Sequence, residues 1–218
     1  FLITAVGCLS SASVPDIAGL SDFQGTWVHT GQWPHEGVAM QGKRVGVVGT
    51  GSSGIQAIPV IAEQAGHLTV FQRTANYSIP ARNAPLSDGF KQRLKAHPEE
   101  TLAIMQQTPN GHCFPIQPRG VFEVSDEERE AIYQASWEKG GLQFRATFND
   151  LLRDTRANQT AADFIRKKIR ATVKDPATAE LLSDIDHPFA AKRPPIDSHY
   201  FETFNRDNVR LVDIRRHP

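Results

Sequence analysis

Residues 43–54 read KRVGVVGTGSSG and decide the fold of this 218-residue chain. A β-branched run that ends at Val48 passes directly into the spacing Gly49-x-Gly51-x-x-Gly54. Gly49 permits a tight turn off a strand, Gly51 lets backbone N–H groups approach a pyrophosphate, and Gly54 lets the next helix lie close to the sheet. A helix that begins here has its positive N-terminal end at the turn, where it would attract an anion. The stretch therefore predicts a phosphate-binding turn between a strand and a helix.

The residues after the turn strengthen this interpretation, although a glycine triplet alone can be purely structural. A second β-like run at 68–71 completes a β-α-β unit, and Pro59 is predicted to bend or locally break the helix between the strands. Apolar residues recur along that helix as one buried face: Ile55, Ile58, Ile61, Ala62 and Ala65. The sequence predicts an α/β fold of the Rossmann type. Cofactor-binding residues are expected in the turn and the first part of the helix: Gly49, Thr50, Gly51, Ser52, Ser53, Gly54 and Gln56.

The end of the second strand indicates which dinucleotide binds. A fold that prefers NAD usually places an acidic residue about 20 residues beyond the glycines, where it holds the ribose 2′-hydroxyl. This chain has Gln72-Arg73-Thr74 at that place and no carboxylate beside it. A guanidinium and a hydroxyl suit a 2′-phosphate, which a carboxylate would repel. Arg73 and Thr74 therefore favour NADP over NAD, and the alternative is that Arg73 is an ordinary surface charge.

A second motif stands directly before this unit and reads FQGTWVHTGQWP from Phe23 to Pro34. With Gly25, His29 and Trp33 it resembles the fingerprint of the type I Baeyer–Villiger monooxygenases, which are flavin-dependent. The segments GTGSSGIQAIP, FQRTANYSIPARNAPL and FNRDNVRLVD resemble the same family, so the resemblance covers most of the chain. Related flavin enzymes that oxygenate nitrogen or sulfur usually lack Trp at this place. The resemblance implies that the fingerprint links two nucleotide-binding domains, and that His29 holds them in register instead of transferring protons.

The resemblance also gives roles to the stretch Lys192-Arg193-Pro194-Pro195. Taken alone, two cations before prolines usually form an exposed loop. In the family, a Lys at this position helps to hold the NADP 2′-phosphate and an Arg enters the active site beside the flavin. These roles are implied for Lys192 and Arg193, and the guanidinium of Arg193 would stabilise a peroxide anion and the developing oxyanion. Asp197 follows closely, but no spacing argument gives it a role.

The middle of the chain, from about 84 to 188, changes from strand patterns to helical ones. The spacing at 125–128 predicts a helix start and the glycines at 140–141 a stop. Asn158 is expected to cap a further helix, and 175–176 to begin the next one. The sequence predicts an all-helical insertion, as in the family, with an aromatic core. Another apolar face is predicted from Phe144, Phe148, Leu151 and Leu152.

Four segments are expected on this basis. Residues 1–37 would be the end of an FAD-binding domain and the fingerprint linker, with a strand in the FLITAVG stretch at 1–7. The NADP-binding domain would occupy 38–83 and, truncated, 190–218, on either side of the helical insertion at 84–189. Family members also carry an FAD-binding glycine motif, which this sequence lacks, so the chain is expected to be an internal fragment.

Composition excludes several classes of function. The 24 basic and 24 acidic residues balance, which gives no net attraction to nucleic acid or to a membrane. No apolar run approaches the roughly 18 residues that cross a bilayer, and no signal peptide is recognisable. Two cysteines, Cys8 and Cys113, are too few for a disulfide framework or a metal site of their own. A cytoplasmic protein without a metal is expected, and the oligomeric state is not indicated.

The resemblance implies a flavin enzyme that uses FAD and NADPH. It would insert one oxygen atom of O₂ beside a ketone carbonyl, through a C4a-peroxyflavin, to give an ester or a lactone. One alternative is a related monooxygenase that oxygenates nitrogen or sulfur, although Trp33 and Arg193 disfavour it. A disulfide reductase is disfavoured because no Cys pair has redox spacing. The remaining alternative is a non-catalytic NADP-binding module, if the chain is complete.

Overall fold

A computed structural model of the chain describes residues 1–7, 11–108 and 111–216. They divide into two compact units, of which the first, Phe1–Met40, contains two 3-10 turns, η1 (Leu20–Asp22) and η2 (Thr30–Gln32). The prediction of a strand at 1–7 is wrong. These residues are exposed and take no regular structure, because no described strand pairs with them. Cys8 lies outside the described residues.

The second unit, Gln41–Pro218, is built on a three-stranded parallel sheet with the order β1-β2-β5. Its strands are β1 (Arg44–Val48), β2 (His67–Gln72) and β5 (Val209–Asp213). The central strand β2 alternates buried and half-buried residues, whereas β1 lies at one edge with Val48 exposed. Gln72 pairs in register with Asp213, so the strands end at one edge of the sheet.

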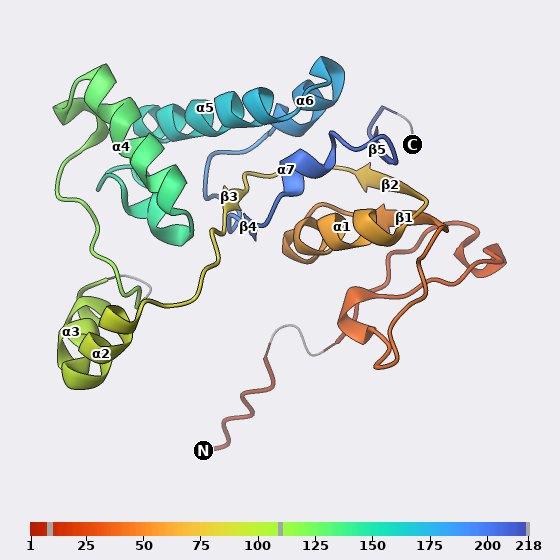
Figure 1. Cartoon of the computed structure of the whole chain (residues 1–218), viewed down its shortest axis with the longest axis horizontal. Helices are drawn as coiled ribbons and strands as arrows, with labels where there is room; N and C mark the ends of the chain where they lie inside the picture. The colour runs from red at the N-terminus through yellow and green to blue at the C-terminus, as the bar shows by residue number, and fades with distance from the viewer. Residues whose placement is uncertain (8–10, 109–110, 217–218) are drawn as a thin grey trace. The chain divides into compact units, whose positions relative to one another are not determined.

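Helix α1 (Ser52–Gln64) connects β1 to β2 and lies beside them (Figure 1). Its predicted apolar face is confirmed, since all five of its residues are buried. Helix α1 continues through Pro59, so this residue does not end it, and the predicted bend stays a prediction. A proline removes one backbone N–H, and the burial of the helix face on both sides of it outweighs that loss.

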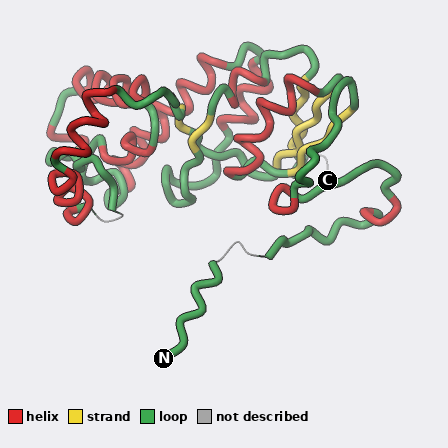
Figure 2. Tube along the Cα trace, turned by 60° about the horizontal axis from the view of Figure 1, so that its bottom comes forward, coloured by secondary structure: helices red, strands yellow, loops and turns green. Residues whose placement is uncertain are grey.

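A smaller parallel sheet pairs β3 (Ile79–Pro80) with β4 (Ile196–Asp197). The described residues between these two strands form helices and loops, as predicted, and Figure 2 shows the helices in red. They are α2 (Asp88–Ala96), α3 (Pro98–Gln107), η3 (Val121–Glu123), α4 (Asp126–Lys139), η4 (Leu142–Ala146), α5 (Thr155–Thr172) and α6 (Pro176–Ser183). The short helix α7 (Tyr200–Thr203) then leads to β5. The boundaries of the four predicted segments stay predictions.

The core of the helical region is aromatic, with the ring of Tyr133 against Phe144, Phe148 and Phe164. The apolar face is confirmed at Phe144, Phe148 and Leu151, which are buried. It is wrong at Leu152, which is exposed because it follows the buried Leu151 directly in a turn.

Helix ends follow the sequence signals with one exception. The starts at 125–128 and at Asp175 and the stop at Gly140 are confirmed. The predicted cap at Asn158 is wrong, because α5 begins one turn earlier. Asp154 accepts the first free N–H groups of that helix, at 2.7 and 3.0 Å, so Asn158 already lies inside it.

Candidate dinucleotide-binding site

The glycine turn between β1 and α1 has the geometry that the sequence predicts. Gly49 has a φ of 99°, and its N–H donates to the carbonyl of Phe71 at 2.9 Å. A Cβ on Gly54 would lie 2.4 Å from the carbonyl oxygen of Gly49, so no side chain fits there. A Cβ on Gly51 would meet no atom within 4 Å. The protein itself therefore requires glycine at 49 and 54, while Gly51 leaves open space above the turn.

The beginning of α1 is suited to an anion. Gly51 is its N-cap and supplies no side-chain cap, and Ser52 and Ser53 behind it are exposed. The first N–H groups of such a helix lack internal partners, and the helix dipole makes this end positive. The residues present therefore fit the pyrophosphate of a dinucleotide.

Two of the predicted cofactor-binding residues also join parts of the site. Thr50 is buried, and its hydroxyl donates to the carbonyl of Thr74 at 2.8 Å, which ties the turn to the segment after β2. The amide of Gln56 donates to the carbonyl of Ile196 at 3.3 Å, which ties α1 to β4. These two hydrogen bonds bring the glycine turn, the segment after β2 and strand β4 together around the first half of α1.

Arg73 is exposed immediately after β2, and Thr74 is half-buried. The residue before them, Gln72, is fully buried and donates to the carbonyl of Leu181 at 2.9 Å. The guanidinium therefore lies at the free end of the strand, where the sequence predicts the discrimination between NADP and NAD.

Sequence reasoning missed one carboxylate at this edge of the sheet. Asp213 ends β5 opposite Gln72 and is buried, and the guanidinium of Arg215 donates to it at 3.0 and 3.2 Å. These hydrogen bonds hold the pKa of Asp213 below its usual range. Asp213 is also only 2% exposed, so it offers little surface to a ribose hydroxyl. The spacing from the glycines points only to the end of β2, and nothing in the sequence shows that β5 lies beside that strand.

Lys192 and Arg193 are both exposed, and the two prolines behind them are buried. Asp197, two residues further on, is also buried, and its carboxylate accepts the hydroxyl of Ser78. Burial raises the pKa of Asp197. This pair was missed as well, because neither residue belongs to a recognisable spacing.

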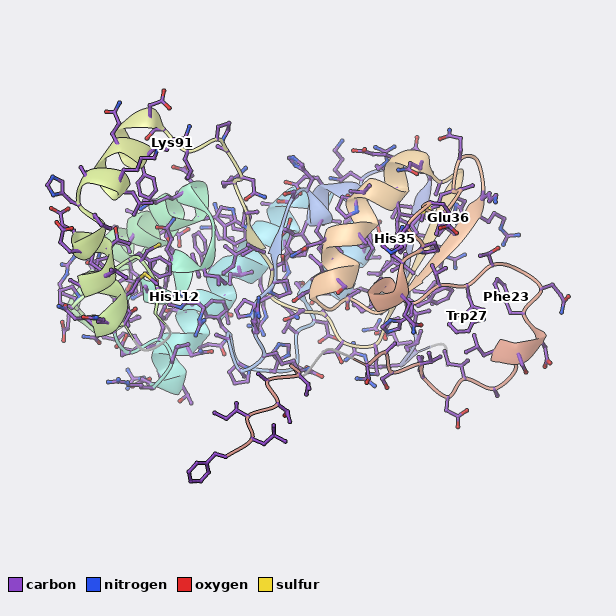
Figure 3. All side chains as sticks on the ribbon, turned by 90° about the horizontal axis from the view of Figure 1, so that it is seen from below. Phe23, Trp27, His35, Glu36, Lys91 and His112 are labelled. Carbon is purple, nitrogen blue, oxygen red and sulfur yellow. The ribbon has the colours of Figure 1, made fainter. Side chains whose placement is uncertain are left out.

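The fingerprint residues lie in the first unit: Phe23, Gly25, His29, Trp33 and Pro34. The ring of Phe23, labelled in Figure 3, lies so close to Gly25 that a Cβ there would be 2.5 Å from it. His29 Nδ1 accepts the N–H of Gly31 at 3.1 Å and begins η2. The neutral ring then carries its proton on Nε2. The contacts of His29 are those of a residue that shapes its own loop.

Two absences hold for the part of the chain that the structure describes. Its His, Cys, Asp and Glu side chains form no group of three or more that could bind a metal ion. None of its helices combines the length and the apolar character that crossing a membrane requires.

No known family model matches the chain, but individual proteins do. Cyclohexanone 1,2-monooxygenase from Acinetobacter sp is 44% identical over 220 residues, which cover 100% of this chain and 40% of that enzyme. Phenazine N-monooxygenase PhzNO1 from Lysobacter antibioticus is 42% identical over the same shares. A solved structure of an oxidised steroid monooxygenase bound to NADP is 53% identical, with a TM-score of 0.92, over 97% of this chain and 40% of that one.

The chain spans about 40% of the length of the curated relatives it matches. The similarity to the solved structure confirms the predicted α/β fold of the Rossmann type. Sequence and fold together show that this chain is homologous to one segment of the Baeyer–Villiger monooxygenases.

Proposed function

We propose that this chain works within an FAD- and NADPH-dependent Baeyer–Villiger monooxygenase that converts a ketone and O₂ into an ester or a lactone. The observation that carries the proposal is the glycine turn. Gly54 is required by packing, whereas Gly51 leaves open space above an uncapped helix end. That combination suits a dinucleotide pyrophosphate. The assignment of NADP is therefore supported by the geometry of the turn and by the similarity to the family, and the assignment of FAD is supported by that similarity alone.

Each part of the site has a role in this proposal. The N–H groups at the start of α1 would hold the pyrophosphate, and Arg73, Thr74 and Lys192 would hold the 2′-phosphate. NADPH, when bound, supplies a hydride to the flavin. The guanidinium of Arg193 would stabilise the negative oxygen that develops on the ketone carbonyl. The fingerprint would link the FAD and NADP domains, and a cytoplasmic location belongs to the same proposal.

Oxygenation of nitrogen is the second candidate. It is favoured by the relative named phenazine N-monooxygenase, which is nearly as similar to this chain as the cyclohexanone enzyme. Overall similarity does not separate the two candidates, because the identities to this chain are 44% and 42%. The two candidates differ in the atom that receives the oxygen.

A product analysis with labelled oxygen tests the proposal. The full-length protein, loaded with FAD, is supplied with NADPH, ¹⁸O₂ and either cyclohexanone or phenazine, and the products are identified by mass spectrometry. A lactone with one ¹⁸O atom is the expected result. An N-oxide without any lactone would establish the second candidate, and NADP binding without any oxygenated product would favour a binding module.

A further inference from the structure

The loop that carries Lys192 and Arg193 is tied at its upstream end by a buried amide. Asn158, only 8% exposed, lies inside α5 and reaches the residue before the loop. Its Oδ1 accepts the N–H of Phe189 at 2.8 Å, and its Nδ2 donates to the carbonyl of Phe189 at 2.8 Å. Both backbone polar groups of Phe189 are therefore held by one side chain, which also donates to Leu151.

A buried carboxylate ties the downstream end of the same loop. One oxygen of Asp197 accepts the hydroxyl of Ser78, and the other accepts the N–H of Tyr200 at 3.0 Å. The backbone beside it is fixed as well, because the N–H of Ile79 donates to the carbonyl of Pro195 at 3.0 Å. Asp197 is 6% exposed, so water does not compete effectively for these hydrogen bonds.

Between the two anchors, the functional cations take their position from the backbone. Among the described residues, none forms a hydrogen bond or a close ion pair with the side chain of Lys192 or Arg193, although the charge of Lys192 helps to lower the pKa of Asp186, whose carboxylate pairs with His187. The prolines at 194–195 fix their own φ angles. Ala190 and His199, at φ values of 64° and 67°, bracket the segment in the left-handed region that side chains disfavour. Such conformations persist where surrounding contacts impose them.

We propose that Asn158 and Asp197 are positioning residues, which hold loop 190–196 in the shape that presents Arg193 to the reacting oxygen and Lys192 to NADP. This inference rests on the function proposed above for the two cations. Neither anchor touches a substrate in this account. Each anchor acts through the backbone of the loop. Loss of an anchor would therefore displace the guanidinium of Arg193 without changing the chemistry of that group.

The test compares anchor variants of the full-length protein with a matched control. Asp197→Ala and Asn158→Ala each remove one anchor, and Asp197→Asn keeps the shape and can still bond to Ser78 and Tyr200. Tyr133→Phe is the control, because it removes a buried hydroxyl that is bonded to Thr160 at 2.8 Å and not to the loop.

Three quantities are measured for each variant. They are the oxygenated product formed per NADPH consumed, the rate of anaerobic flavin reduction at saturating NADPH, and the hydrogen exchange of the peptide spanning 190–196. In Asp197→Ala and Asn158→Ala, the product per NADPH should fall by about tenfold or more, since small displacements of a catalytic group have effects of that size. Hydrogen exchange of the loop should quicken, while flavin reduction stays within about threefold of the wild type. Asp197→Asn should recover most of the yield.

The inference is overturned if the anchor variants behave like Tyr133→Phe, with a lower melting temperature but unchanged yield and unchanged loop exchange. If Asp197→Ala does not fold, Ser78→Ala removes the donor hydroxyl alone and should shift yield and exchange in the same direction. The wild-type protein separates the two proposals. If it forms no ester or lactone, the proposed function fails, and loop exchange together with the affinity for NADP⁺ still decides whether the anchors hold the loop.

Discussion

At residue scale, the glycine turn separates a packing requirement from a binding requirement. Gly54→Ala would place a Cβ 2.4 Å from a carbonyl oxygen, so we expect a destabilisation of about 1–3 kcal/mol, typical of overpacking. Gly51→Ala meets no protein atom and should melt as the wild type does, while its methyl group obstructs the pyrophosphate. Thermal melting with and without NADP⁺ distinguishes them. Equal stabilisation of Gly51→Ala and the wild type by NADP⁺ would contradict the binding role.

Arg73 should discriminate between the two nicotinamide cofactors. Its exposed guanidinium follows β2 directly, where we propose that the 2′-phosphate binds, and a hydrogen bond to a charged group is worth about 1.5–3 kcal/mol. Arg73→Ala should weaken NADPH use by that amount and leave NADH nearly unaffected. The values of kcat/KM for both cofactors provide the measurement. Equal losses would show that Arg73 supports the fold.

The buried carboxyl of Asp197 makes stability depend on pH in a predictable direction. Burial raises its pKa, against the hydrogen bonds from Ser78 and Tyr200, while Glu202 adds to the rise and His199 opposes it. The folded state therefore binds this proton more tightly than the unfolded state. Its contribution to stability is complete below the ordinary value of 3.8 and is lost as the pH rises through the folded pKa.

Asp197→Asn removes this titration and should flatten the pH dependence. The melting temperature of the variant is expected to fall less than that of the wild type between about pH 4 and pH 7. Melting curves recorded across that range provide the comparison. Parallel curves for the two proteins would mean that Asp197 titrates normally.

At the scale of elements, prediction succeeded where the signal was local. The β1-α1-β2 unit follows from a glycine spacing and a helical apolar pattern, both contained in one short stretch. The start of α5 failed because Asp154 and Asn158 are both cap-forming residue types one turn apart, and the apolar pattern fits either start. Tertiary contacts decide between the two residues. Asn158 is buried in the insertion, whereas Asp154 is exposed and caps the helix.

The anchors of loop 190–196 show more strongly why contacts between distant residues cannot be predicted from the sequence. Ser78 and Asp197 are 119 residues apart, and β3 and β4 have two residues each, too few to show a periodic pattern. A lone Asp after two prolines predicts nothing about a partner so far away. The predicted site residues on α1 were found through a motif, whereas the residues that hold the loop become visible only through contacts.

At the scale of the whole molecule, the proposed function places Arg193 beside the flavin, which this chain alone does not contain. Arg193→Ala in the full-length protein should lower ketone oxygenation by about 100-fold or more, the usual effect of losing a preorganised charged donor. NADPH should still reduce the flavin, because Lys192 and the glycine turn are intact. Anaerobic stopped-flow absorbance measures the reduction, and gas chromatography measures the product. Normal product formation would exclude Arg193 from the active site.

The pairing of β3 with β4 has a consequence for the order in which the second unit folds. It joins Ile79 to Ile196, so the chain must close a very long loop, whereas β1 and β2 are joined by one helix. Closing a long loop costs chain entropy before any contact compensates for it, which delays such pairings. In refolding followed by pulsed hydrogen exchange, the amides of β1 and β2 should gain protection before those at 79–81. Loop 190–196, proposed here to serve the chemistry, would then be among the last parts of the chain to acquire its shape.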